Sequence, residues 1–170
     1  MEATDILPFD VEEIPNSSFN VFLGRRRSGK SVLVEYLLKQ MVDKKMLDLV
    51  FLFSPTDAGF EIIDKECRFK DIEELHTIIE NFRLLNEYNK SIKKKREKIK
   101  IRCMIILDDF AVKLKSKSFN ILETLAVNGR HISYLPLALH FCILSQSLTK
   151  IPRVVRLNTD HIFLNSIGSS

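Results

Sequence analysis

An eight-residue motif near the start of the chain limits the possible folds more than any other feature of its 170 residues. Residues 24–31 read Gly-Arg-Arg-Arg-Ser-Gly-Lys-Ser and match the pattern G-x-x-x-x-G-K-[ST] at every fixed position. This pattern forms a loop between a strand and a helix, where glycines let backbone N–H groups wrap around phosphate oxygens. The flanking residues agree with that context. Residues 19–23 are a short apolar run of strand type, and apolar residues recur at helical spacing from 30 to 44.

The motif and the residue after it are therefore expected to bind the phosphates of ATP. These residues are Gly24, Arg25, Arg26, Arg27, Ser28, Gly29, Lys30, Ser31 and Val32. We expect Lys30 to place its positive charge on the β- and γ-phosphate oxygens, and the Ser31 hydroxyl to ligate Mg²⁺. Two interpretations stay open for the three arginines. They either contact phosphates or a neighbouring subunit, or they are simply solvated, which we favour.

A second motif lies at the end of an apolar run. Residues 103–107 read Cys-Met-Ile-Ile-Leu, and Asp108 and Asp109 follow directly. An apolar strand that ends in carboxylates is typical of a Walker B strand, which places acidic groups next to the phosphates. Asp108 is expected to hold Mg²⁺, directly or through water, and Asp109 to orient or deprotonate the attacking water. The alternative is a pair of aspartates that only cap the following helix.

The order of the two motifs selects among P-loop folds. A complete strand (47–53) and a helix (72–85) separate Lys30 from Asp108. This spacing favours ATPases that have an extra strand between the two motif strands over simple nucleotide kinases. A GTPase switch is disfavoured, because Ala111 stands where such proteins have a glycine and no N-K-x-D occurs.

The remaining segments complete an alternation of strands and helices, which predicts a largely parallel sheet. They are a helix capped by Ser118 and strands over 139–145 and 161–164. We therefore predict an α/β fold, a three-layer P-loop NTPase of the additional-strand (ASCE, RecA-like) type. It is expected to form a single domain over residues 19–170, after an extended N-terminal arm over residues 1–18.

Composition argues against several other classes of protein. The net charge of +4 hides a basic run from Lys90 to Arg102, which has eight basic residues and one acidic residue. The three cysteines form no C-x-x-C pair, which argues against a disulfide framework or a zinc site. The acidic N-terminus lacks the features of a signal peptide, and no apolar stretch is long enough to span a bilayer. We expect a protein that is not secreted and has no membrane span.

Four shorter motifs complete the series: Asn128-Gly129-Arg130-His131, Leu144-Ser145-Gln146, Ile151-Pro152-Arg153 and Arg156-Leu157-Asn158-Thr159-Asp160. Together with the two main motifs, they resemble the FtsK–HerA superfamily, and within it the genome-packaging ATPases of large double-stranded DNA viruses. The resemblance covers roughly residues 19–164. It implies a homomeric ring, a pentamer or hexamer, that translocates double-stranded DNA and contacts a capsid or portal-vertex protein. It also implies a location in the cytoplasm of the infected host cell or in the virion.

The resemblance implies roles for individual residues as well. Gln146 corresponds to a polar sensor beside the Walker B strand, which contacts the γ-phosphate or the attacking water. Arg130 corresponds to an arginine that family members offer to the ATP of the neighbouring subunit, and Arg156 is a second candidate. The alternative for Arg130 is a helix C-terminal arginine that neutralises the macrodipole. His131 is interpreted as structural, because a phosphoryl-transfer site already has its acid and base roles filled.

The basic run over residues 90–102 precedes the Walker B strand, so we expect it at the end of the sheet opposite the nucleotide. Charge runs of this kind are usually solvated helix ends or loops. The functional alternative is contact with DNA phosphates, which needs charge but no reading of bases. Lys113, Lys115 and Lys117 follow the Walker B strand instead, and are expected on the nucleotide side, towards the pore of a ring.

The preferred function is an ATP-hydrolysing motor that moves double-stranded DNA into a preformed viral capsid. Within the same superfamily, the alternative is a cellular or plasmid DNA translocase. From another class, the alternative is a nucleotide-dependent assembly or switch protein that does not move DNA, and DNA-stimulated turnover separates the two. A small-molecule kinase is the weakest alternative, because no substrate-binding lid is evident.

Overall fold

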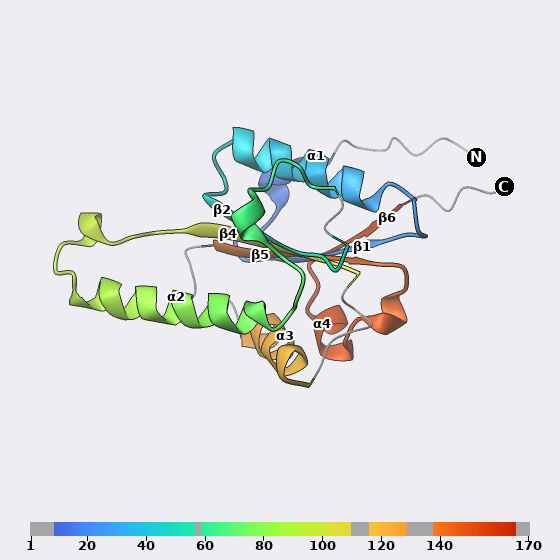
Figure 1. The fold of residues 1–170 in the computed structure, drawn as a ribbon. Helices are drawn as coiled ribbons and strands as arrows, with labels where there is room; N and C mark the ends of the chain where they lie inside the picture. The colour runs from blue at the N-terminus through green and yellow to red at the C-terminus, as the bar shows by residue number, and fades with distance from the viewer. Residues whose placement is uncertain (1–8, 57–58, 110–115, 129–137, 166–170) are drawn as a thin grey trace.

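A computed structural model describes residues 9–56, 59–109, 116–128 and 138–165. Its strands are β1 (Phe19–Leu23), β2 (Leu49–Phe53), β3 (Arg68–Phe69), β4 (Arg102–Asp108), β5 (Ala138–Ser145) and β6 (His161–Leu164). Its helices are α1 (Lys30–Asp43), α2 (Glu74–Ser91), α3 (Ser116–Asn128) and α4 (Arg153–Leu157). Within these residues, the strands form one parallel sheet in the order β3-β2-β4-β5-β1-β6. One face is covered by α1 and the other by α2, α3 and α4, which confirms the three-layer prediction (Figure 1).

The central strands owe their position to continuous apolar sequence. Every residue of β5 is buried, and in β4 only the first and last residues are partly exposed. Strands in the middle of a parallel sheet are covered on both faces, so they show no alternation of polar and apolar residues. β5 pairs with β4 on one side and with β1 on the other. The predicted extra strand between the two motif strands is therefore present.

The helices follow the predicted apolar periodicity, but some predicted boundaries are wrong. α2 continues to Ser91, so the basic run starts inside a helix. α3 begins at Ser116, which makes Ser118 an internal helix residue instead of the cap. The short helix α4 was not predicted, because a single turn and a half shows no periodicity. None of the helices in the described residues has the length and apolar character needed to cross a bilayer.

The N-terminal segment packs onto the sheet instead of extending away from it. Within its described part, residues 9–18, the short 3-10 helix η1 spans Val11–Glu13. Val11 and Ile14 are buried in the same apolar cluster as the inner face of α1. Burial of two apolar side chains stabilises this docking, so the description as an extended arm is corrected for these residues. The domain boundary at residue 19 stays a prediction.

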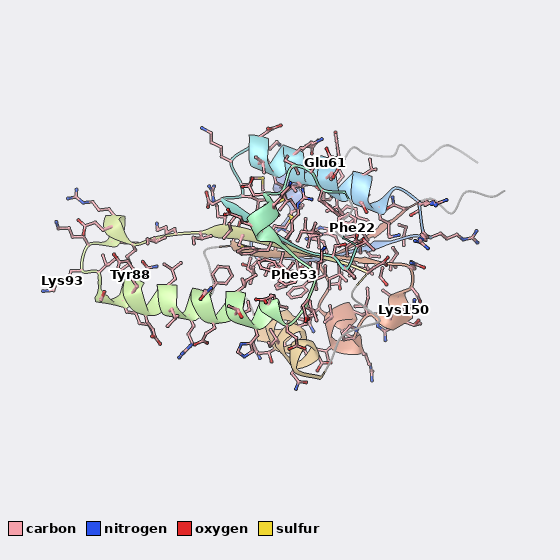
Figure 2. All side chains as sticks on the ribbon, in the orientation of Figure 1. Phe22, Phe53, Glu61, Tyr88, Lys93 and Lys150 are labelled. Atoms are coloured by element: carbon pink, nitrogen blue, oxygen red, sulfur yellow. The ribbon has the colours of Figure 1, made fainter. Side chains whose placement is uncertain are left out.

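Because all strands are parallel, the molecule has two distinct ends. The carboxyl ends of the strands lie together, and in open α/β sheets this is the end that binds ligands. Figure 2 places Lys93, in the basic run, at the opposite end of the molecule from Lys150, which follows β5. The basic run is therefore far from the carboxyl ends of the strands, as its position before β4 predicts.

Candidate nucleotide-binding site

The loop of the first motif connects the end of β1 to the start of α1. The N–H of Gly24 donates to the Ser145 carbonyl of the neighbouring strand at 3.3 Å, and the Ser28 N–H closes a turn on the Arg25 carbonyl at 3.1 Å. Gly29 precedes α1 with a φ of 86°, a left-handed conformation that residues with a side chain rarely adopt. The strand–loop–helix context that the motif requires is present.

Lys30 lies beneath this loop and is only 8% exposed. Its Nζ donates to the carbonyl oxygens of Gly24 and Arg25, both at 3.0 Å. The first N–H groups of any α-helix have no intrahelical partner, and they carry the positive end of the helix dipole. The ammonium group and the start of α1 therefore concentrate positive charge at the loop, which suits phosphate groups.

The other motif residues are more accessible. Ser31 is partly buried in the first turn of α1, and Val32 is 70% exposed. The side chains of Arg25, Arg26 and Arg27 are exposed, which agrees with the solvated interpretation. The expected part of these arginines in binding ATP stays a prediction. In it, their backbone N–H groups contact the phosphates, and their guanidinium groups do not.

The two carboxylates of the second motif end β4 beside β5. Asp108 is partly buried and lies opposite Leu144 in the strand register. Asp109 is exposed, and its N–H donates to the Leu144 carbonyl at 3.4 Å. Asp109 has a left-handed φ of 56°, so the extended backbone of β4 does not continue through this residue. The two neighbouring carboxylates therefore have different environments.

Electrostatics links the two motifs. Burial and the neighbouring charge of Asp109 raise the pKa of Asp108 to about 6, while the positive charge of Lys30 lowers it. The fold has thus brought the lysine of the loop close enough to Asp108, across β5, for their charges to interact. A carboxylate whose pKa is perturbed by burial and by named charges is typical of a functional site.

Gln146 follows β5 directly and is exposed. Because β5 lies between β1 and β4, this residue stands at the carboxyl end of the sheet, between the loop and the Asp108–Asp109 pair. That placement suits a sensor of the γ-phosphate or of the attacking water. The role itself stays a prediction.

The candidate arginines are placed less completely. Arg130 and His131 lie outside the described residues. Arg156 is in α4, and its Nε is buried with no hydrogen-bond partner among the described residues. Asp160, from the same sequence motif as Arg156, joins the start of β6 to the start of β1. Its carboxylate accepts a hydrogen bond from the Phe19 N–H at 2.9 Å, and its own N–H donates to the Phe19 carbonyl at 2.8 Å.

Asn165, the first residue after β6, also contacts the phosphate-binding loop and was not predicted to do so. Its N–H donates to the Leu23 carbonyl at 2.8 Å, and its side-chain Nδ2 donates to the Ser28 carbonyl at 3.2 Å. No motif marks this residue, and it reaches the loop from 137 positions later in the chain. Only the pairing of β6 with β1 brings it there.

The donor groups at the site fit Mg²⁺ bound together with phosphates. In nucleotide sites Mg²⁺ is held by one or two protein oxygens, by phosphates and by water. The Asp108 carboxylate and the Ser31 hydroxyl are groups of this kind, at the end of β4 and the start of α1. The described part of the chain has no cluster of three or more His, Cys, Asp or Glu side chains for an all-protein metal site. Ser31 and Asp108 stay the predicted Mg²⁺ ligands.

The parallel sheet with its inserted strand, and the loop and carboxylates at its carboxyl end, define a P-loop ATPase of the additional-strand type. Over residues 7–170 the sequence also matches the model of the family described as Poxvirus A32 protein. The chain belongs to this family, which comprises genome-packaging ATPases of the FtsK–HerA type. No curated protein matches the sequence.

Solved structures share the fold at low sequence identity. The pCW3 conjugation coupling protein TcpA, solved as a monomer with ATPgS, is 16% identical with a TM-score of 0.59, over 85% of this chain and 47% of that one. EssC (ATPases 2 and 3) from Geobacillus thermodenitrificans is 15% identical with a TM-score of 0.56, over 89% and 33%. Thermomonospora curvata EccC (ATPases 2 and 3), in complex with a signal sequence peptide, is 15% identical with a TM-score of 0.55, over 84% and 28%. The chain therefore spans less than half the length of each of these proteins.

Proposed function

We propose that this ATPase uses Mg²⁺ and ATP to move double-stranded DNA, and that it packages a viral genome into a preformed capsid. The observation that carries the proposal is the sheet order, which places the loop with Lys30 at the carboxyl end of β1 and Asp108 at the carboxyl end of β4, on either side of β5, in a chain of the Poxvirus A32 family. A P-loop lysine and a Walker B carboxylate at the same end of a parallel sheet are the arrangement of enzymes that hydrolyse ATP. Family membership supports packaging as the work that hydrolysis drives, and it disfavours a cellular or plasmid translocase.

In this proposal the motif residues divide the chemistry. Lys30 neutralises charge on the β- and γ-phosphate oxygens, while loop N–H groups hold these oxygens in place. Ser31 and Asp108 hold Mg²⁺, which supplies further positive charge at the transferred phosphoryl group. Asp109 orients the attacking water and accepts its proton. Gln146 contacts that water or the γ-phosphate from the end of β5.

The partner assignments rest on the family. We propose a homomeric ring, a pentamer or hexamer, that engages a capsid or portal-vertex protein in the infected cell or the virion. The remaining rival is an assembly or switch protein that binds ATP without moving DNA. Turnover with and without duplex DNA, together with a mass measurement of the oligomer, tests the proposal. Turnover that duplex DNA leaves unchanged, in a stable ring, would favour the switch.

The two carboxylates are expected to fail in different ways when neutralised. Asp109→Asn should retain Mg-ATP but turn it over slowly, because only the activation of water is lost. Asp108→Asn should weaken the metal-dependent part of ATP binding. ATP titrations with and without Mg²⁺, combined with single-turnover rates, measure both effects. Asp43→Asn, which changes an exposed carboxylate at the end of α1, is the control and should match wild type. If both active-site variants lost binding equally and neither trapped ATP, the assigned roles would be wrong.

A structured basic projection supports contact with DNA. The basic projection is the segment Lys90–Arg102, which runs from the end of α2 through the 3-10 helix η3 (Lys95–Glu97) into β4. Figure 1 shows that the end of α2 and this segment extend past the sheet. Two hydrogen bonds, of 2.7 and 2.8 Å, join the side chain of Asn89 to the backbone of Ile99 and hold the two arms together. The exposed lysines therefore stand on a segment with a defined shape, and their solvated interpretation stays open beside contact with DNA.

Neutralising the basic projection should weaken duplex binding regardless of sequence. The variant replaces Lys93, Lys94, Lys95 and Arg96 with glutamine, and each lost phosphate contact should reduce the slope of log K against log salt by roughly one. Binding titrations at several salt concentrations measure the slope. The control neutralises Lys39 and Lys65, which are exposed elsewhere, and should keep it. An unchanged slope would assign the projection to solvation and move the DNA contact to Lys113 and Lys115, which lie outside the described residues, and to Lys117.

A further inference from the structure

Asn165 continues the pairing of β6 with β1 up to the residue that precedes the phosphate-binding loop. Its backbone N–H donates to the carbonyl of Leu23, the last residue of β1, at 2.8 Å. This bond does not depend on the side chain, so any residue except proline retains it. The backbone pairing of β6 with β1 therefore does not explain why this residue is an asparagine.

Both glycines of the loop motif face this side chain. A Cβ atom at Gly24 would lie 3.0 Å from the Cβ of Asn165, as well as 2.4 Å from the Oγ of Ser28. A Cβ at Gly29 would lie 3.8 Å from the Nδ2 of Asn165. The loop thus leaves room for Asn165 at Gly24, whereas a Cβ at Gly29 would make only ordinary van der Waals contact with it. The amide reaches the Ser28 carbonyl, between the two glycines, at 3.2 Å.

The same side chain has an atom that contributes nothing to the stability of the fold. The Oδ1 of Asn165 is buried with no hydrogen-bond partner among the described residues. Burying an unpaired acceptor lowers stability, so stability alone does not account for an asparagine here. The amide orientation follows from its surroundings, since the opposite orientation would place Oδ1 against the Ser28 carbonyl oxygen.

Fixing the Ser28 carbonyl also fixes the next N–H group. The Ser28–Gly29 peptide is planar and trans, so its C=O and N–H bonds point in opposite directions. When Nδ2 of Asn165 holds the Ser28 carbonyl on the β6 side, the Gly29 N–H must point away from β6. Gly29 is the N-cap of α1, so this N–H belongs to the donors at the start of the helix that are expected to face phosphate.

We propose that Asn165 is a positioning residue for phosphate binding, which aims the Gly29 N–H by holding the Ser28 carbonyl. The inference deepens the proposed function, because it requires that this loop binds the phosphates of a nucleotide. Asn165 touches no reacting atom. Its loss should therefore weaken binding of phosphates in ground state and transition state alike, which raises KM and leaves kcat nearly unchanged.

The test uses Asn165→Ala and Asn165→Asp in the full chain. Alanine removes the donor without adding charge. Aspartate keeps the shape of the side chain but replaces the donor with an acceptor that repels the Ser28 carbonyl. Loss of one hydrogen bond of ordinary strength corresponds to a Kd for ADP that is about three- to tenfold higher, and the aspartate should cost at least as much. Asn81→Ala, which changes an exposed asparagine on α2, is the control and should leave Kd unchanged.

Calorimetric titration with Mg-ADP gives Kd, thermal unfolding without nucleotide gives stability, and steady-state turnover separates KM from kcat. A purely structural role would lower the thermal midpoint of both variants and leave Kd at the wild-type value, which would overturn the inference. If the alanine variant does not fold, Asn165→Ser takes its place, because serine is uncharged and polar but too short to make the same hydrogen bond to the Ser28 carbonyl. If the wild-type protein binds no nucleotide, the proposed function itself is contradicted. If the wild type and both variants bind nucleotide with equal Kd, the positioning role of Asn165 is contradicted, while the proposed function stands.

Discussion

Lys30→Ala is expected to abolish ATP hydrolysis, with a loss of turnover of about 10³-fold, while the domain stays folded. The ammonium group is held under the loop by the carbonyl oxygens of Gly24 and Arg25, next to where the loop is proposed to bind phosphate. Alanine removes this charge from the site. It also removes two hydrogen bonds to the loop, so part of the loss should appear as weaker ATP binding.

Phosphate release at saturating ATP measures the loss, and thermal unfolding shows whether the variant is folded. Lys39→Ala is the matched control, because Lys39 lies on the same helix with its side chain exposed. It should hydrolyse ATP at the wild-type rate. Wild-type turnover by a cleanly folded Lys30→Ala protein would contradict the central assignment of the site.

Arg130→Ala is expected to cut turnover by about 10³-fold or more while leaving ATP affinity almost unchanged, as for other arginine fingers. Lys30 supplies positive charge from within the subunit, and a finger from the neighbour would supply it from the far side of the γ-phosphate. Isolated monomers should then be nearly inactive, and specific activity should rise with protein concentration. Sedimentation and turnover measured over the same concentration range test this dependence.

Mixing experiments decide whether the active site is shared. Arg130→Ala and Lys30→Ala subunits, each inactive alone, should recover partial activity together, because some interfaces pair an intact loop with an intact finger. Arg156 is the alternative finger, and its buried Nε has no hydrogen-bond partner among the described residues. Recovery with Arg156→Ala in place of Arg130→Ala would move the finger to α4. If co-assembled rings recover no activity in either mixing experiment, with Arg130→Ala or with Arg156→Ala, the active site is not shared between subunits.

The sequence alone determined the local parts of this protein. β1 spans Phe19–Leu23 and α1 begins at Lys30, both as predicted, because the glycines and the lysine of the loop mark these boundaries within a few residues. The buried strands β4 and β5 were recognisable for a similar reason, since a strand covered on both faces needs an unbroken apolar run. The same local reasoning failed at Ser118, because Ser116 offers the same capping side chain two residues earlier, at the observed start of α3. It also missed α4, which is too short to show a period.

Only the tertiary structure decided which of these parts meet. The docking of Val11 and Ile14 against the α1 side of the sheet, the influence of Lys30 on the pKa of Asp108, and the contact of Asn165 with the loop each join distant segments. The sheet order makes the last two contacts, because it places β5 between the motif strands and β6 beside β1. Strand order depends on packing across the two faces of the sheet, and side chains that meet through it leave no periodic or short-range pattern in the sequence.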